Sequence, residues 1–378
     1  MSAQLSRRLN LAFVVHDYHR HGGQSRYVVE LATRFRRDHE IHVYANTVDD
    51  TDTAGIQFHH VPAWRSSALA SILSFVVPAT LMVRKHDIVH AQGLCGLRHT
   101  VATAHFIQPA WHAAQAEFCG STTWKQRIAQ WLIAPLERRA LLGRGVRRVI
   151  AVSGRTAADI RQHYGRTRGV SIIHHGVDAE TFHPGLRAQC RPGLLKQLGL
   201  AEDAVLALFA GNLQKGGAAA VETIARVPGV HLLLATASDT RAIMNQAHHL
   251  GCGDRVHALG FSKHLERWLA AADMLLYPTF FDTFGLVIAE AMACGIPVVT
   301  TLRAGASDLV QHGETGWLVD DPRNIDALAE GVRLLVNDSG LRTRLGNASR
   351  AVAEKRTWDA VAEETMAVYR GMLEEPGW

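Results

Sequence analysis

The sequence predicts an α/β protein of two domains, each built on a parallel β-sheet with helices on both faces. Its 378 residues exceed what one ordinary hydrophobic core holds and fit two domains of roughly 150–200 residues. Short apolar runs alternate with longer amphipathic stretches along the chain, a pattern typical of parallel sheets with crossover helices. In each half, the first apolar run leads into a glycine-containing loop and then a helix.

The composition is that of an ordinary globular protein, with 47% hydrophobic and 20% charged residues. A net charge of +5 favours anionic ligands without requiring nucleic acid. The five cysteines form no Cys-x-x-Cys motif, and none of the 22 histidines joins a familiar ligand spacing, so we expect no metal site and a reducing compartment. The opening MSAQLSRRLN lacks the apolar region of a signal peptide, which makes the cytoplasm the expected location.

The first half opens with an expected strand over residues 9–16, a loop containing Gly22 and Gly23, and a helix over 24–37. This is the layout of a Rossmann-type unit, in which glycines let the backbone approach a ligand that faces the helix amino end. The two glycines do not complete a Gly-x-Gly-x-x-Gly motif, so a plain tight turn stays open as the alternative.

Further strands are expected over residues 41–45, 57–61, 88–91 and 100–105, with a helix over 68–84 between them. Ligands of parallel sheets gather at the carboxyl ends of strands. His105 lies at such an end, after the apolar run TVATA, and is a candidate site residue. A structural role for a lone histidine is the alternative.

The segment 111–149 has an amphipathic pattern with a basic stretch, ERRALLGRGVRR, behind it. One side of the pattern carries Trp124, Ile128, Trp131, Leu132 and Leu136. One interpretation is a surface that meets an anionic membrane holding a lipid acceptor. The other, which we favour from sequence, is a helix packed in the core with a solvated basic face. A strand over 149–152 follows, and Ser153 is expected to cap the helix over 156–164.

The composition shifts to Gly, Pro, Arg and Leu over residues 185–200, so we place the domain boundary near Pro184. The expected domains are 1–184 and 185–357, with a final helix within 358–378. The second domain begins with a strand over 205–210, the loop GNLQKGG, and a helix from about residue 218. Lys215 in that loop supplies a point charge for a phosphate.

The stretch YPTFFDTFGLVIAEAMACGIPVVT, residues 277–300, carries most of the expected chemistry. It contains a strand end, a loop with Asp282, a helix over 286–293 with Glu290, and a second strand. The helix amino end would aim free N–H groups and a positive dipole at the loop, which suits phosphate. The two carboxylates suit sugar hydroxyls. The alternative is that Asp282 caps the helix and Glu290 is an ordinary polar residue.

Residues 282–299, with Gly260, Asp273, Pro278 and Gly316, resemble the carboxyl-terminal half of the retaining glycosyltransferases of family 4. That family carries two glutamates eight positions apart, then an alanine, small residues and Gly-x-Pro-Val. Here Asp282 takes the first position and is shorter by one methylene, while Glu290 keeps the second. The resemblance spans essentially the whole chain. It implies the GT-B architecture, two facing Rossmann-like domains with an interdomain cleft, whose last helix crosses back onto the first domain.

The resemblance also implies a site. It would be a metal-independent hexosyltransferase site without cofactor that takes a nucleotide diphosphate sugar, with a uridine diphosphate sugar as the expected donor. The catalytic residues would be His105, Asp282 and Glu290. Glu290 would also bind the donor, together with Gly22, Gly23, Asn212, Lys215, Gly260, Phe261, Ser262, Thr283, Phe284, Gly285 and Leu286. The family has an arginine where this chain has Asn212, with the lysine five positions beyond rather than three, so the loop is shorter here.

The acceptor implied by the resemblance is a hydroxyl of a saccharide, a lipid-linked or a small molecule, in cell-envelope glycan, lipopolysaccharide or glycolipid synthesis. The expected location is the cytoplasm, with peripheral contact at the inner face of the membrane and no nucleic-acid partner. One alternative is a nucleotide-sugar epimerase or a phosphorylase of the same architecture. The Asp282–Glu290 spacing argues against the former, and the lack of a recognisable cofactor lysine argues against the latter. Another alternative is a catalytically inactive GT-B subunit that binds nucleotide or a partner.

Overall fold

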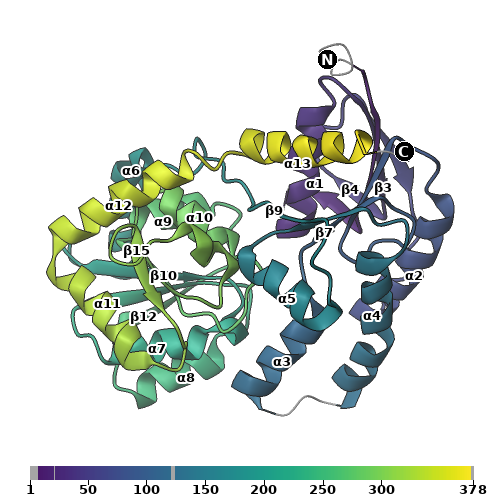
Figure 1. Ribbon diagram of the computed structural model, residues 1–378. Helices are drawn as coiled ribbons and strands as arrows, with labels where there is room; N and C mark the ends of the chain where they lie inside the picture. Colours follow the sequence, from purple (N-terminus) through teal and green to yellow (C-terminus); the bar gives the residue numbers. More distant parts are fainter. Residues whose placement is uncertain (1–6, 21, 121–123, 376–378) are drawn as a thin grey trace. The chain divides into compact units, whose positions relative to one another are not determined.

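The computed structural model describes residues 7–20, 22–120 and 124–375 (Figure 1). The chain divides into two compact units, residues 1–175 with 358–378, and residues 176–357. The division falls at His175 rather than near Pro184, because the segment after His175 bonds to the second unit. Val177 N donates to the carbonyl of Arg356 at 2.9 Å, and Arg350 Nη1 donates to that of Phe182 at 2.7 Å.

The first unit is built on a seven-stranded sheet of order β5-β3-β1-β6-β7-β8-β9. Every adjacent pair in it is parallel. The strand order reverses between β1 and β6, which makes the carboxyl ends of these two strands the place where a ligand is expected. The strands are β1 (Asn10–Val14), β3 (Glu40–Ala45), β5 (Ile56–His60), β6 (Ile88–Gln92), β7 (Val101–Ala104), β8 (Arg148–Ala151) and β9 (Val170–Ile172); β2 (Asp17–His19) and β4 (Thr47–Asp49) pair separately.

The helices of the first unit include the last helix of the chain. They are α1 (Gly23–Phe35), α2 (Ala68–Met82), α3 (Gln108–Cys119), α4 (Trp124–Leu142), α5 (Gly154–Tyr164) and α13 (Trp358–Leu373). Figure 1 shows α13 lying across α1. The Tyr369 hydroxyl lies 2.6 Å from His90 Nδ1, and the hydroxyls of Tyr27 and Thr365 are 3.3 Å apart. Both contacts are buried, so α13 completes the core of this unit.

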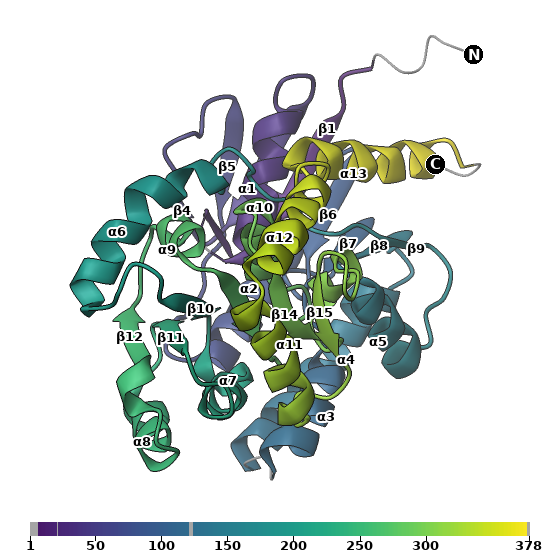
Figure 2. The same cartoon turned by 90° about the vertical axis from the view of Figure 1, so that its left-hand side faces the viewer.

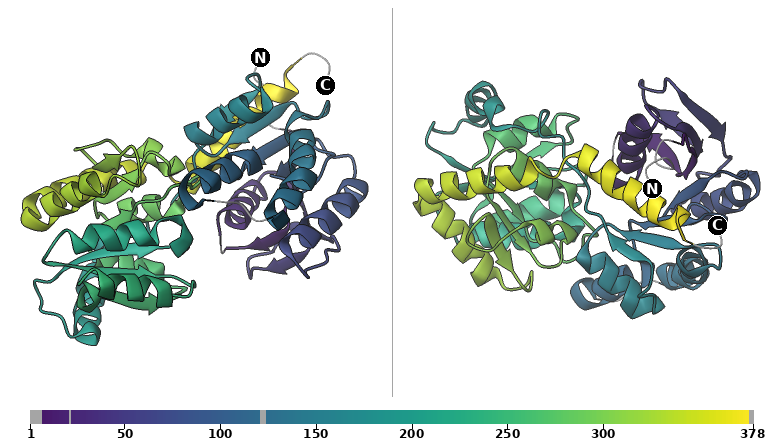
Figure 3. Two further views of the ribbon diagram at one scale, coloured as in Figure 1. Left: turned by 90° about the horizontal axis from the view of Figure 1, so that it is seen from below. Right: turned by 45° about the horizontal axis from the view of Figure 1, so that its top comes forward.

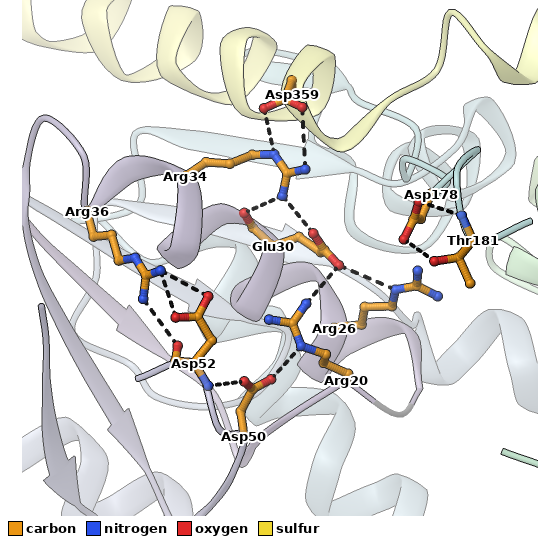
Figure 4. Close-up of polar contacts among 10 residues, drawn as sticks. All are labelled: Arg20, Arg26, Glu30, Arg34, Arg36, Asp50, Asp52, Asp178, Thr181 and Asp359. Carbon is orange, nitrogen blue, oxygen red and sulfur yellow. Dashed lines mark hydrogen bonds and ion pairs between the residues drawn. The ribbon is translucent and has the colours of Figure 1, made fainter. Parts of the chain in front are cut away.

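A charged network holds α1 in place (Figure 4). Glu30 is 8% exposed and accepts from Arg34 Nη1 at 2.6 Å, and Arg34 Nε donates to Asp359 of α13 at 2.9 Å. Arg20, which precedes the glycine turn, places its Nε 2.8 Å from Asp50. A carboxylate this buried is stable only with such partners, so the network fixes both α1 and the chain that enters its amino end.

The second unit is built on a six-stranded sheet of order β12-β11-β10-β13-β14-β15, with every adjacent pair parallel (Figure 2). The strands are β10 (Val205–Ala210), β11 (Val230–Ala235), β12 (Val256–Gly260), β13 (Met274–Tyr277), β14 (Val298–Thr301) and β15 (Gly316–Val319). The order reverses between β10 and β13. The central strands are fully buried, as sheets covered on both faces require.

Helices cover both faces of this second sheet (Figure 3). They are α6 (Arg187–Leu198), α7 (Gly217–Ala225), α8 (Arg241–His249), α9 (Leu265–Ala271), α10 (Leu286–Ala293), α11 (Ile325–Asn337) and α12 (Ser339–Ala353). Two parallel sheets, each sandwiched between helices, confirm the α/β fold class predicted from the sequence.

Candidate active site

The carboxyl ends of β10 and β13 bring the two most informative loops of the second unit together. The strands pair directly, with Leu208 opposite Leu275. Strand β10 is followed by a short 3-10 turn, Leu213–Lys215, and strand β13 is followed by the loop that carries Asp282. The strand order reverses between these strands, and ligands of parallel sheets are expected at the carboxyl ends of strands at such a switch point.

The turn that carries Lys215 is tied to the loop after β13. Phe280 N donates to the Lys215 carbonyl at 3.0 Å. Gly216 allows this approach, because a Cβ at that position would lie 2.5 Å from the Pro278 carbonyl oxygen. Asn212, which the sequence placed among the donor-binding residues, caps the turn by accepting from Gln214 N at 2.9 Å.

Asp282 and Lys215, both predicted as site residues, form an ion pair. Lys215 Nζ lies 2.8 Å from Asp282 Oδ2, and the hydroxyl of Tyr277 donates to the same oxygen at 2.8 Å. Burial, reinforced by the Asp282 carboxylate, raises the pKa of Tyr277 well above its ordinary value, so the hydroxyl keeps its proton. This contact adds Tyr277 to the candidate site. It was not predicted from the sequence, because a tyrosine at the end of an apolar strand has the pattern of a core residue.

The alternative in which Asp282 caps α10 is not what the structure shows. The cap position of α10 is Gly285, whose φ of +86° lies in the left-handed region that favours glycine. Asp282 Oδ1 instead lies 3.4 Å from Phe284 N, within the loop. The predicted phosphate-binding segment, Thr283 to Leu286, therefore runs from this loop into the amino end of α10.

Glu290 lies in the second turn of α10 and is 7% exposed. Every residue of α10 after Leu286 is buried, so the helix is a rigid support for this carboxylate. Burial and the adjacent Glu290 raise the pKa of Cys294, which keeps this thiol protonated and unsuited to act as a nucleophile.

The loop after β12 lies at the same carboxyl edge of the sheet, two strands from β10. Gly260 has a φ of +78°, and its carbonyl accepts from Thr236 N at 2.9 Å. Ser262 Oγ accepts from His264 N at 2.9 Å, which shapes the loop. Phe261 is 68% exposed, so its ring presents a flat apolar surface.

The first unit places its predicted residues at the switch point between β1 and β6. Gly22 caps α1 with a φ of +81°, and apart from its chain neighbours no described residue has an atom within 4 Å of where its Cβ would stand, which leaves room for a ligand beside this backbone. Gly23 is the first residue of α1. His105 follows β7, and its Nε2 lies 2.8 Å from Gln92 Oε1 at the end of β6. Gln92 is fully buried and was missed from sequence because its partner is set by strand order.

His105 is flanked by the rings of Tyr27 and His175, with centroids at 5.2 and 5.4 Å. Burial lowers the pKa of His105 to about 3. The imidazole is therefore neutral at physiological pH and can exchange hydrogen bonds with hydroxyls without carrying charge.

Within the described parts of the chain, no group of three or more His, Cys, Asp or Glu side chains is arranged to hold a metal ion. No helix among the described residues combines the length and apolar character needed to cross a membrane.

Comparison with solved structures defines the class. WaaG, a glycosyltransferase involved in lipopolysaccharide biosynthesis, superimposes with a TM-score of 0.79 at 20% identity, covering 96% of this chain and all of WaaG. Sucrose-phosphate synthase from Thermosynechococcus elongatus gives 0.78 at 23% identity over 97% and 99% of the two chains. Anabaena HepE in complex with UDP and glucose gives 0.73 at 20% identity over 96% and 100%. The fold is thus that of a GT-B glycosyltransferase.

The family follows from the sequence comparisons. The family described as Glycosyl transferases group 1 matches residues 193–352, and Glycosyltransferase Family 4 matches residues 21–181. The chain belongs to glycosyltransferase family 4, as the resemblance implied. D-inositol 3-phosphate glycosyltransferase of Xylanimonas cellulosilytica is 29% identical over 391 residues, covering 92% of this chain and 91% of the relative. The Streptomyces avermitilis protein of the same name is 28% identical over 410 residues, covering 93% and 84%.

Proposed function

We propose that this glycosyltransferase moves a hexose from a uridine diphosphate sugar to an acceptor hydroxyl, with retention of configuration and without a metal or other cofactor. The observation that carries the proposal is the pairing of Lys215 with Asp282 in front of the amino end of α10, at the switch point of the second sheet. A cation paired with a carboxylate, beside a loop that runs into a helix amino end, suits a diphosphate joined to a sugar. HepE, which shares the fold, was solved with UDP and glucose.

Each side chain then has a role that fits its surroundings. Lys215 and the N–H groups from Thr283 to Leu286 hold the diphosphate. Asp282 accepts from hydroxyls of the donor sugar, and the buried Glu290 accepts from the ribose hydroxyls. The exposed ring of Phe261, with the backbone of Gly260 and Ser262, meets the base.

The first unit contributes further groups suited to a donor sugar. The open backbone at Gly22 and Gly23 allows close approach of the donor. His105, neutral and held by Gln92, exchanges a hydrogen bond with a sugar hydroxyl.

The reaction that these groups support is a front-side displacement. The bond between the anomeric carbon and the diphosphate oxygen breaks, and the acceptor oxygen bonds to the same face of that carbon. The acceptor proton passes to the departing phosphate oxygen. Negative charge grows on the diphosphate, and Lys215 with the helix amino end stabilises it, so preorganised electrostatics replace a side-chain nucleophile.

We place the acceptor in cell-envelope glycan, lipopolysaccharide or glycolipid synthesis, as a saccharide, lipid-linked or small-molecule hydroxyl, and the protein in the cytoplasm. WaaG is involved in lipopolysaccharide biosynthesis, and the curated relatives glycosylate D-inositol 3-phosphate, a small polyol phosphate, so both kinds of acceptor fit relatives of this chain.

A surface on the first unit supports peripheral contact with an anionic membrane. The interpretation favoured from sequence, that the apolar side of α4 is packed in the core, is wrong for three residues: Trp124, Ile128 and Trp131 are 67%, 48% and 76% exposed. Val77 and Leu81 of α2 are also exposed, at 62% and 76%. An apolar groove of about 260 Å³ separates the helices, lined by Leu73, Val76, Val77, Thr80, Leu81, Leu97 and Leu136.

The two helices that carry these exposed apolar residues, α2 and α4, also bring exposed basic side chains. Arg84 and Lys85 follow α2, Arg138 and Arg139 lie in α4, and all four are exposed. Tryptophans beside cations are the composition of surfaces that bind the interface of an anionic bilayer. Flotation with phosphatidylglycerol-rich vesicles tests the contact. We expect binding that Leu81→Ser weakens and that the matched surface change Leu250→Ser, in the second unit, does not. Equal binding to phosphatidylcholine vesicles would contradict contact with an anionic membrane. If the wild-type protein is a dimer and Leu81→Ser is a monomer, the surface is instead an interface between two copies of the chain, which would also contradict a membrane role.

Nucleotide release tests the proposed activity without knowledge of the acceptor. The protein is incubated with uridine, guanosine and adenosine diphosphate sugars in the presence of EDTA. We expect slow release of uridine diphosphate from one donor, because transferases hydrolyse their donors slowly. Binding without any release would favour the inactive-subunit alternative, and release that requires a divalent ion would contradict the metal-independent mechanism.

A further inference from the structure

The Asp282 carboxylate is not free to accept hydrogen bonds from a sugar, because it is already bound by two donors of the protein. Both strong donors fall on one oxygen, Oδ2, with Lys215 Nζ and the Tyr277 hydroxyl each at 2.8 Å. Among the residues that the structure describes, Oδ1 has only the long contact to Phe284 N, at 3.4 Å. The Asp282 side chain is 14% exposed and that of Lys215 is 29% exposed, so the pair is sheltered from water on most sides. In this state Asp282 neutralises the cation that the diphosphate needs.

The backbone leaves Asp282 little freedom to move away. Its N–H donates to the Arg303 carbonyl at 3.1 Å, and its own carbonyl accepts from Gly305 N at 2.9 Å. Tyr277 is equally fixed, since it is 3% exposed and its ring packs against Phe209 at 5.6 Å and beside Gly211. Lys215 ends in a flexible four-carbon chain, so it is the partner of the three that can change its position.

We propose that Tyr277 is a positioning residue for Asp282 and that the Lys215–Asp282 ion pair is a latch that the donor opens. The inference rests on the proposed function. When a nucleotide sugar binds, the Lys215 ammonium turns to the diphosphate, and a sugar hydroxyl takes the position that it leaves on Oδ2. Tyr277 keeps its hydrogen bond throughout and so holds the carboxylate in place while its other partner is exchanged.

The exchange has a consequence for selectivity. A nucleotide sugar gives each residue of the broken ion pair a new partner, because the diphosphate binds Lys215 and a sugar hydroxyl binds Asp282. A nucleoside diphosphate lacks the donor sugar, and its ribose hydroxyls are placed at Glu290, so no hydroxyl replaces Lys215 on Asp282 and the broken ion pair is compensated only in part. The site should therefore prefer the donor over the product diphosphate, which favours product release after the sugar has left.

Calorimetric binding of uridine, guanosine and adenosine diphosphate to the full chain is the test, with wild type identifying the nucleotide. We expect Asp282→Asn to bind that diphosphate about two- to fivefold more tightly, the range of a partly exposed ion pair, while its turnover of the nucleotide sugar falls. In a Lys215→Met background the same change should have no effect. Equal or weaker binding by Asp282→Asn would overturn the latch. If Asp282→Asn tightens diphosphate binding equally in wild type and in Lys215→Met, the latch is also overturned. That result would mean that the Asp282 carboxylate simply repels the diphosphate.

Tyr277→Phe tests the positioning role separately. We expect kcat/KM for the nucleotide sugar to fall at least tenfold while the Kd of the nucleoside diphosphate stays unchanged, since the ion pair survives. Tyr44→Phe, which removes another half-buried tyrosine hydrogen bond far from this loop in sequence, should alter neither. A parallel loss of donor turnover and diphosphate binding in Tyr277→Phe would overturn the positioning role. If wild type binds none of the three diphosphates, the proposed function itself fails; if it binds one and the variants do not respond, only the latch fails.

Discussion

Contacts between residues that are close in the sequence could be predicted, whereas contacts between distant residues could not. Ser153 was predicted as a helix cap, and it accepts from Thr156 N at 3.1 Å. Capping is a short-range interaction, so the adjacent residues were sufficient to predict it. Lys215 and Asp282 were each predicted as site residues, but their pairing over 67 positions depends on the order of strands in the sheet. Tyr277 and Gln92 were missed because their partners are defined by the fold rather than by neighbours in the chain.

Glu290 is the residue whose loss should be most specific for activity. We expect Glu290→Gln to reduce nucleotide release about 10- to 100-fold, because one charged hydrogen bond is worth roughly 1.5–3 kcal/mol. The amide keeps the size of the carboxylate, so the thermal melting temperature should change little. Steady-state kinetics and a melting curve on the same preparation provide the check. Near-normal release in a folded variant would remove Glu290 from the site.

At the scale of elements, strong apolar periodicity was the reliable signal. The expected ranges 205–210 and 286–293 coincide with β10 and α10. Helix α12 was not predicted, because its sequence holds Gly340 and Gly346 and few apolar residues. The structure explains one of them: a Cβ on Gly346 would stand 2.1 Å from the Gly295 carbonyl oxygen, so the glycine lets α12 approach α10 closely.

The same steric logic applies to the turn that presents Lys215. Gly216→Ala would push a methyl group against the Pro278 carbonyl, and overpacking of this kind costs about 1–3 kcal/mol. We expect lower stability and weaker binding of the nucleoside diphosphate, measured by denaturant unfolding and calorimetry. Gly193→Ala is the matched control. Its Cβ would meet nothing within 4 Å, and alanine in helix α6 should be neutral or stabilising. Equal effects of the two changes would contradict the steric account.

For the whole molecule, the two-domain α/β organisation followed from length and alternation of elements. The protonation states of three histidines, of which His99 is buried and His86 and His105 are half-buried, did not follow from the sequence. Burial lowers the pKa of His99 and of His86 to about 4 and that of His105 to about 3. These histidines are neutral in the folded protein but take up protons near pH 6.5 when it unfolds.

The unfolded state therefore binds more protons between about pH 6.5 and 4, and the stability from these histidines is lost as the pH falls through that range. His99, 5% exposed, contributes on the order of 3 kcal/mol by itself. Glu137 acts in the opposite sense, since burial raises its pKa to about 7 and the folded state holds its proton. We expect the free energy of unfolding to be several kcal/mol lower at about pH 5 than at about pH 7.5.

Denaturant titrations at both pH values check this balance. His99→Gln, which keeps a donor for the Ala140 carbonyl, should flatten the pH dependence, and Glu137→Gln should steepen it. A free energy of unfolding that is the same at the two pH values in wild type would contradict the assignment of these buried groups.

The central claim is a nucleotide-sugar site at the switch point of the second unit, and thermal melting with a panel of nucleotide sugars tests it most directly. At about a hundred times the dissociation constant, one uridine diphosphate sugar should add roughly 2.7 kcal/mol to the free energy of unfolding. The gain should persist with EDTA and disappear in Glu290→Gln and Lys215→Met. Stabilisation that survives in both variants, or no stabilisation by any donor of the panel, would contradict the claim.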